Sequence, residues 1–211
     1  LNLSTGTNSG YSLRLPLNAT VTSASVNFST LSELTLSGND VWDTQIDNPN
    51  PTWGNSSLKD CNFGNYSHTR VGKTVWSNWH IYRSLYSFNL SQFPGTTVLD
   101  ANLSFWVDNV VTNANSGLPV TTQHTYSVHP LLKDWVEGLE MASPVQLGPG
   151  ATWNNAIDNL SGSDYSWTTA GASSSSDRDP SVASITETPA NLKQNWMTFN
   201  SQSLTNLVQG W

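Results

Sequence analysis

The chain has 211 residues, which is long enough to bury one substantial core, so a single folded body is the expected organisation. Only 11% of the residues are charged, against roughly 25% in an average soluble domain, and 30 serines, 23 threonines and 23 asparagines supply most of the polarity. The net charge of -7 offers no basic surface to a phosphate backbone, which excludes nucleic acid as an expected partner.

Cysteine content and hydropathy exclude two further classes of protein, small disulfide-stapled domains and membrane-inserted proteins. A single cysteine, Cys61, cannot form an intrachain disulfide, so the chain is not a small disulfide-stapled domain. No run approaches the roughly 20 apolar residues of a membrane span, so membrane insertion is not expected. No basic and then apolar leader precedes Leu1, and we expect that any export leader has already been removed.

Alternating apolar residues predict β-structure along most of the chain. In Thr97–Val107, for instance, Ala101, Leu103, Phe105 and Val107 share one face, as in a half-buried strand. The other predicted strands, in chain order, are Tyr11–Leu15, Val21–Phe28, Val41–Ile46, Tyr82–Phe88, Thr125–Pro130 and Trp196–Phe199. Short strands separated by loops rich in Asn, Gly, Ser and Pro indicate an all-β sandwich or jelly roll.

Helical spacing of apolar residues is confined to two short segments, Leu131–Leu139 and Leu204–Trp211, each of which predicts one or two helical turns. The serine-rich segment Gly171–Asp179 predicts a flexible surface loop.

Asparagine sequons suit an exported, N-glycosylated protein. Because the composition alone gives about six matches to Asn-x-Ser/Thr, the excess is mild and composition carries most of the expectation of an extracellular or cell-surface location. The candidate glycosylation sites are Asn2, Asn18, Asn27, Asn55, Asn65, Asn89, Asn102 and Asn159.

Several segments in order along the chain match one family pattern: Asp43–Asp47 (DTQID), Tyr82–Leu90 (YRSLYSFNL), Asp134–Gly138 (DWVEG), Thr152–Asn155 (TWNN) and Leu207–Trp211 (LVQGW). With them, residues 41–211 resemble the DNRLRE, or disaggregatase-related, domains of exported archaeal and bacterial proteins. That family includes carbohydrate-binding modules of polysaccharide-degrading enzymes, and the resemblance implies a β jelly roll with one or two helical turns.

The two ends depart from the family pattern. Its usual last strands are absent after Trp211, whereas residues 1–40 form an additional N-terminal strand segment. An incomplete sheet exposes unpaired backbone groups, so the N-terminal segment of one subunit could complete the next subunit by strand addition and produce a head-to-tail filament. The candidate donor residues are Leu13, Leu15, Val21, Ala24, Val26 and Phe28. Self-completion within the chain, or truncation of a longer protein, is the alternative.

Motifs for catalysis and metal binding are missing from the sequence. The four histidines lack zinc spacing, and no nucleophile elbow, phosphate loop or dinucleotide fingerprint occurs. His80, Tyr82 and Arg83 suggest a lyase-like cluster, since positions 80 and 82 share a strand face, but an isolated cluster is insufficient to predict an enzyme. Asp43 and Asp47 also share a face and would suit a structural Ca²⁺, with solvated carboxylates as the simpler interpretation.

Ten tryptophans raise the question of which are buried and which are exposed. Trp135, Trp153 and Trp167 are predicted to pack in the core. Exposed indoles can stack on sugar rings or line an assembly interface, and polar surroundings favour that role at Trp53, Trp76 and Trp79. The sequence therefore supports two hypotheses: a glycosylated filament or surface-layer subunit assembled by strand donation, or a carbohydrate-binding module of an exported enzyme or adhesin.

Overall fold

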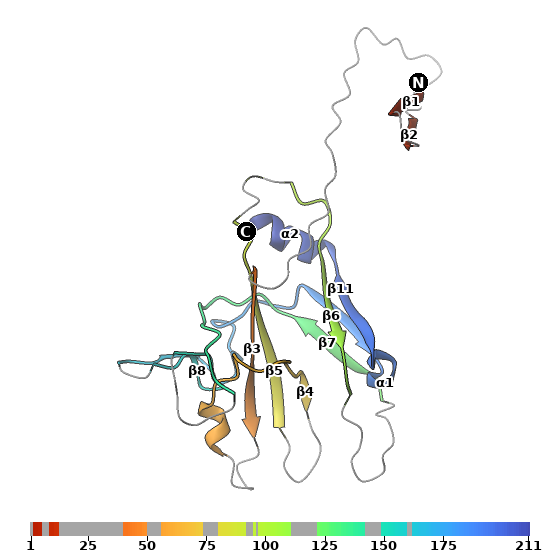
Figure 1. Cartoon of the computed structure of the whole chain (residues 1–211). Coiled ribbons are helices and arrows are strands. Elements are labelled where there is room, and N and C mark those ends of the chain that lie inside the picture. Colours follow the sequence, from red (N-terminus) through yellow and green to blue (C-terminus); the bar gives the residue numbers. More distant parts are fainter. Residues whose placement is uncertain are drawn as a thin grey trace. The chain divides into compact units, whose positions relative to one another are not determined.

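The structure is a computed structural model of the whole chain (Figure 1), and it describes residues 2–5, 9–12, 40–49, 56–73, 80–91, 95, 97–110, 122–141, 149–159 and 162–211. The chain divides into two compact units, Leu1–Thr35 and Leu36–Trp211. The six donor-strand candidates between Leu13 and Phe28 lie outside the described residues.

The first unit contains one described antiparallel hairpin. Strand β1 (Asn2–Thr5) pairs with β2 (Ser9–Ser12), and Asn2 lies opposite Ser12. The predicted strand at Tyr11–Leu15 overlaps the end of β2.

The second unit, the body, is built from short antiparallel sheets, which confirms the all-β prediction. Strand β5 (His80–Phe88) lies between β3 (Val41–Pro49) and β4 (Gly72–Lys73) in the longest of these sheets. The remaining pairs are β6 (Asn102–Val107) with β11 (Asn195–Asn200), β7 (His124–Val128) with β10 (Ala183–Glu187), and β8 (Asn155–Ile157) with β9 (Tyr165–Ser166). The helical elements of the body are η3 (Ser56–Asp60), α1 (Pro189–Leu192) and α2 (Gln202–Gly210).

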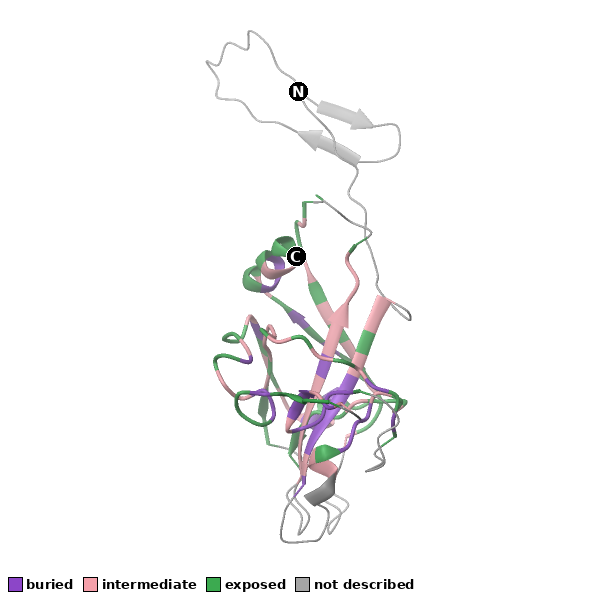
Figure 2. Ribbon diagram, turned by 90° about the vertical axis from the view of Figure 1, so that its left-hand side faces the viewer, coloured by how far each residue is buried: buried purple, intermediate pink, exposed green. Residues whose placement is uncertain are grey.

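One hydrophobic cluster covers a face of the β3–β5 pair, and we call it the loop-built cluster. Ile46 and Leu85 project from β3 and β5, Ala156 lies in the short strand β8, and the other buried members come from connecting segments between residues 151 and 172. Its buried members are Ile46, Leu85, Ala151, Trp153, Ala156, Trp167 and Ala172. Figure 2 shows such buried stretches, in purple, both along strands and along irregular chain.

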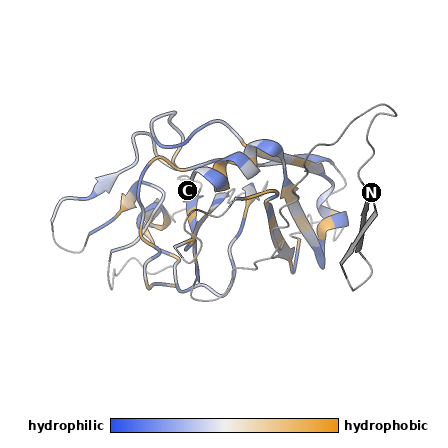
Figure 3. Ribbon diagram, turned by 90° about the horizontal axis from the view of Figure 1, so that it is seen from above, coloured by the Kyte–Doolittle hydropathy of each residue, from blue (hydrophilic) through white to orange (hydrophobic). Residues whose placement is uncertain are grey.

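A second cluster, the strand-built cluster, lies under β6, β7, β10 and β11. Burial alternates along β6, where Leu103, Phe105 and Val107 face inward and the intervening residues are exposed. Helix α2 adds Leu204 and Val208, and its first turn is capped by the Ser201 hydroxyl, which accepts the Leu204 N–H at 3.0 Å. Figure 3 shows hydrophobic and hydrophilic stretches, in orange and blue, next to one another along the strands and helices of the body. The prediction of a helix near Leu204–Trp211 is confirmed.

The predicted helix at Leu131–Leu139 is wrong. This segment contains no helical turn and is mostly irregular, and burial alternates from Leu131 to Glu137. Tertiary partners replace the helical hydrogen bonds: the Val136 carbonyl accepts the Ala151 N–H at 2.7 Å, and the Glu137 carbonyl accepts the Asn62 amide at 2.7 Å. Gly138 then adopts a φ of +84°, a left-handed conformation that favours glycine.

The segment predicted as a flexible loop, Gly171–Asp179, is instead organised around a buried carboxylate. Asp177 has no exposed surface and accepts the N–H groups of Thr168 at 2.7 Å and Thr169 at 3.0 Å. Lys133 lies 3.1 Å from the same carboxylate. The prediction from serine-rich composition is therefore wrong, because the Asp177 carboxylate accepts hydrogen bonds from backbone N–H groups and fixes the turn.

Candidate functional site

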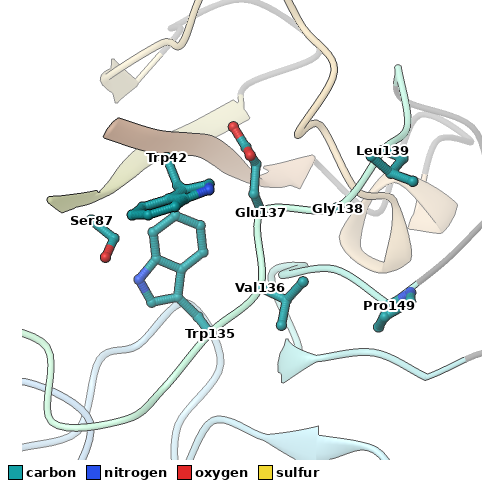
Figure 4. Close-up of a pocket in the computed structure, with 8 residues that line it drawn as sticks. All are labelled: Trp42, Ser87, Trp135, Val136, Glu137, Gly138, Leu139 and Pro149. Atoms are coloured by element: carbon teal, nitrogen blue, oxygen red, sulfur yellow. The ribbon is translucent and has the colours of Figure 1, made fainter. Parts of the chain in front are cut away.

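An open groove of about 450 Å³ lies beside the first strand of the body. Figure 4 shows the two indole rings that form one wall and the carboxylate and aliphatic side chains that continue it. The lining residues are Trp42, Ser87, Trp135, Val136, Glu137, Gly138, Leu139 and Pro149.

The alternation of β3 places Trp42 in this groove. Trp42 shares a strand face with Thr44 and Ile46, and these two residues are completely buried against the loop-built cluster. Trp42 itself lies two residues before Thr44, near the start of β3, and remains 40% exposed. Trp135 packs against the cluster from the other chain segment. The groove is therefore the place where the loop-built cluster opens to solvent.

The wall segment, residues 135–139, is held in place by one buried amide. Asn62 donates to the carbonyls of Glu137 and Ala151, and its own carbonyl accepts the Gly64 and Glu140 N–H groups. A Cβ on Gly138 would lie 2.1 Å from the Asn62 amide oxygen, so only glycine fits there. The wall is consequently a fixed surface built on Asn62.

The groove lies beside the unpaired edge of β3 at its first residues, Val41–Asp43, because Thr44–Asp47 further along the strand are almost completely buried. Among the described strands β3 pairs with β5 alone, so its other edge carries backbone groups directed away from the sheet. One of these, the Asp43 N–H, donates to the Glu137 carboxylate at 3.1 Å. Burial raises the pKa of the Asp43 carboxyl above its ordinary value. A side chain therefore occupies part of an edge that a further strand could pair with.

The apolar character of the groove extends along the wall segment. Val136 and Leu139 line the groove and are 36% and 69% exposed, and Leu132 and Met141, on either side of this segment, are also exposed. Ser87 and Glu137 are the polar side chains of the lining. Such a surface suits alternate apolar side chains of an extended peptide better than a ligand that needs many hydrogen bonds.

A second, polar constellation lies on the other face of the same sheet. His80 Nδ1 lies 2.9 Å from both carboxylate oxygens of Asp47, and the His80 and Tyr82 rings stack with centroids 5.4 Å apart. The Arg70 guanidinium lies 5.7 Å from the Tyr82 ring centroid. Burial raises the pKa of Asp47, although His80 and Arg70 oppose the shift. These contacts satisfy a carboxylate that is almost completely buried.

The structure separates the residues of the suggested lyase-like cluster. His80 and Tyr82 share a face, as predicted, but Arg83 projects to the opposite side. There its guanidinium lies 5.2 Å from the Trp153 ring centroid and donates to the Gly171 carbonyl and the Ser173 hydroxyl. The structure therefore does not bring His80, Tyr82 and Arg83 together on one face, because adjacent strand positions alternate between faces.

Asp43 and Asp47 share a face, but Asp47 is engaged by His80. Within the described ranges, no group of three or more His, Cys, Asp or Glu side chains could hold a metal ion. Cys61 is buried, and burial, assisted by Glu140, raises the pKa of its thiol to about 11. The thiol therefore stays protonated at neutral pH.

The remaining sequence-predicted residues are distributed over both units. Asn65 and Asn102 are exposed, Asn89 and Asn159 are partly buried, and Asn2 begins β1. Trp153 and Trp167 are buried as predicted, whereas Trp135 is only partly buried and lines the groove. Outside the described residues lie Asn18, Asn27, Asn55, Trp53, Trp76 and Trp79.

Four tryptophans to which the sequence analysis assigned neither a core nor a stacking role lie at the surface: Trp42, Trp106, Trp196 and Trp211. A signal for one of them was present in the sequence. Trp106 occupies the opposite parity to Leu103, Phe105 and Val107, which predicts an outward side chain.

Comparison of the chain with protein-family models, with curated proteins and with solved structures finds no match. In the part of the chain that the structure describes, none of the helices combines the length and the apolar character needed to cross a membrane.

Proposed function

We propose that the protein is a structural subunit of an extracellular, N-glycosylated filament or surface layer, assembled head-to-tail by donation of its N-terminal strand segment. The observation that carries this proposal is the apolar groove beside the first residues of β3, Val41–Asp43, which are partly exposed and have no partner strand on that side among the described strands. A groove of this kind accepts an added strand through backbone pairing at the edge and through burial of alternate side chains. In this proposal the protein is not an enzyme and needs no cofactor.

The chemistry of the groove matches the composition of the proposed donor. Trp42, Val136 and Leu139 offer apolar surface, and the N-terminal segment carries apolar residues at the donor positions between Leu13 and Phe28. Each apolar side chain that becomes fully buried contributes about 1.5–3 kcal/mol, so a few alternate side chains supply most of the attraction.

The division of the chain also supports donation between subunits. Residues 1–35 group as a compact unit of their own, and the described strands β1 and β2 pair with each other. In this proposal a segment from a neighbouring copy pairs with β3 on the side where no described strand pairs with it. Because donor and acceptor are different surfaces of one chain, the contact is heterologous and the assembly stays open.

Negative-stain electron microscopy of the purified full chain tests the proposal. We expect filaments or sheets from the full chain and dispersed particles from a chain lacking residues 1–35. In the body, Leu139→Asp places a charge in the apolar groove and should abolish assembly. Leu99→Asp is the matched control, since Leu99 is 67% exposed but lies outside the groove, and this variant should assemble normally.

Two results would contradict strand donation into this groove. One is a full chain that stays monomeric at all accessible concentrations, as measured by analytical ultracentrifugation. The other is unimpaired filament formation by Leu139→Asp together with Trp42→Ala. Circular dichroism of each variant separates a lost contact from a lost fold.

A carbohydrate-binding module is the second candidate function. The residues that first suggested it, Trp53, Trp76 and Trp79, lie outside the described residues. A different observation favours it, namely the exposed pair Trp106 and Trp196 on β6 and β11.

A further inference from the structure

Two exposed tryptophans face each other on the outer surface of the β6–β11 pair. Trp106 and Trp196 are direct cross-strand partners, and their ring centroids lie 5.5 Å apart with an interplanar angle of 70°. They are 53% and 58% exposed, so each indole keeps free surface. This edge-to-face contact fixes the two rings against each other and reduces the entropy that a ligand would otherwise have to remove.

The rest of this outer face is a ladder of uncharged polar side chains. Next to the tryptophans, the Ser104 and Thr198 hydroxyls lie 2.9 Å apart, and Asn102 lies opposite Asn200. All six side chains alternate with residues of the strand-built cluster, which keeps the backbone beneath them rigid. We call these six residues the aromatic platform: Asn102, Ser104, Trp106, Trp196, Thr198 and Asn200.

The hydroxyl pattern continues on the neighbouring pair of strands. The Thr125 and Thr186 hydroxyls lie 2.9 Å apart across β7 and β10, as do those of Ser127 and Ser184. Strands β10 and β11 contact each other, and all four strands cover the same cluster. The outer surface therefore offers hydroxyl pairs over more than the two strands that carry the indoles.

A protein partner does not fit this surface. A stable protein interface buries about 800 Å² on each side and has an apolar centre of several residues. On the aromatic platform the two indoles are the apolar side chains, and the other four are amides and hydroxyls. Two large exposed rings bordered by such groups nevertheless leave apolar surface in water, which indicates a ligand that is itself apolar on one face and polar at its edges.

We propose that the aromatic platform binds an uncharged polysaccharide chain. A pyranose ring presents a face of C–H bonds that stacks on an indole, and its hydroxyls lie at the ring edge where the Ser104 and Thr198 side chains can pair with them. The six platform residues carry no charge, so they offer no ion pair to an acidic sugar. From Trp106 to Asn102 the ladder extends about 13 Å, which accommodates more than one ring.

This inference is independent of strand donation, because the aromatic platform and the groove share no residue. Affinity electrophoresis of the full chain tests it, in native gels that contain hydroxyethyl cellulose, mannan or dextran, with polygalacturonate as the acidic comparison. Protein made without N-glycans is used, so that a sugar chain attached to Asn102 does not compete for the same face. We expect retardation in at least one neutral gel and none in polygalacturonate.

Single substitutions locate the binding surface. Trp106→Ala and Trp196→Ala should each weaken binding about tenfold or more. Trp106→Phe retains an aromatic face and should retain most of the binding. Trp211→Ala is the matched control, because Trp211 is 64% exposed and lies outside the aromatic platform. Near-ultraviolet circular dichroism confirms that each variant is folded.

Three outcomes would overturn the proposal. The first is normal migration of the wild-type chain in all three neutral gels. The second is unchanged retardation of the double variant Trp106→Ala, Trp196→Ala. The third is sugar-free self-association that requires Trp106, measured by sedimentation velocity, because it would make the platform an interface between copies of the chain.

Discussion

The loop-built and strand-built clusters bury similar kinds of side chains but satisfy their backbones differently. In the strand-built cluster, ladders such as β6–β11 pair the backbone groups, so apolar residues only have to alternate. In the loop-built cluster, individual polar side chains form hydrogen bonds with the backbone groups. Asp177 accepts the Thr168 and Thr169 N–H groups, and Trp167 donates to the Thr152 carbonyl at 3.0 Å. The loop-built region should therefore depend far more on individual polar atoms.

The largest expected effect is at Asp177. Asp177→Asn removes the charge that accepts the N–H groups of Thr168, Thr169 and Ser174 and faces Lys133, and it leaves these three donors with one carbonyl oxygen. We expect the free energy of unfolding to fall by about 3–5 kcal/mol, as for a broken buried ion pair. Urea denaturation measures this loss. Asp179→Asn is the control, since Asp179 is exposed and should change stability by less than about 0.5 kcal/mol. A similar result for both variants would refute the special role of Asp177.

The same carboxylate predicts how stability depends on pH. Burial alone would raise the pKa of Asp177, but the Thr169 and Thr168 N–H groups and Lys133 outweigh it and hold the pKa well below its ordinary value. Stabilisation by Asp177 is therefore complete above the unfolded pKa of about 3.9 and is lost as the pH falls through that value towards the folded pKa. In melts from pH 2 to pH 6, the gap between wild type and Asp177→Asn should narrow below pH 4. A constant gap would contradict this linkage.

A smaller effect separates hydrogen bonding from packing at the aromatic residues. Trp167→Phe keeps a buried ring but leaves the buried Thr152 carbonyl without the indole donor. Its cost should be about 1–3 kcal/mol. In the strand-built cluster, Phe199→Leu also shrinks a buried ring but removes no hydrogen bond, and it should cost less than about 1.5 kcal/mol. Thermal unfolding of both variants makes the comparison, and a larger loss for Phe199→Leu would reverse it.

The contrast also explains which parts of the fold were predictable from sequence. Strand alternation located β3, β5, β6, β7 and β11, because side chains on a strand take alternate faces whatever their partners are. The helix predicted from apolar spacing at Leu131–Leu139 does not form, because Ala151 and Asn62 donate hydrogen bonds to the carbonyls of Val136 and Glu137. Strand β10 was not predicted, because its sequence ASITE carries few apolar residues.

The candidate sites were predictable from the sequence only where they depend on local strand alternation and not on contacts between distant residues. The groove brings together Trp42, Ser87 and the segment 135–139, and contacts that are distant in sequence have no local signature. The aromatic platform is different, since parity along β6 already directs Trp106 outward once Leu103 and Phe105 are placed inside. What the sequence does not contain is the register that sets Trp196 opposite Trp106.

The smallest expected effect on stability is at the aromatic platform. Ser104→Ala removes one hydroxyl of an exposed pair, and water replaces the lost partner of Thr198, so the free energy of unfolding should change by no more than about 0.5 kcal/mol. Retardation in neutral polysaccharide gels should nevertheless decrease, because the same hydroxyl pairs with the ligand. A surface that contributes nothing to folding but is needed for retention is a binding surface. Equal retention by Ser104→Ala and wild type would restrict the contact to the two indoles.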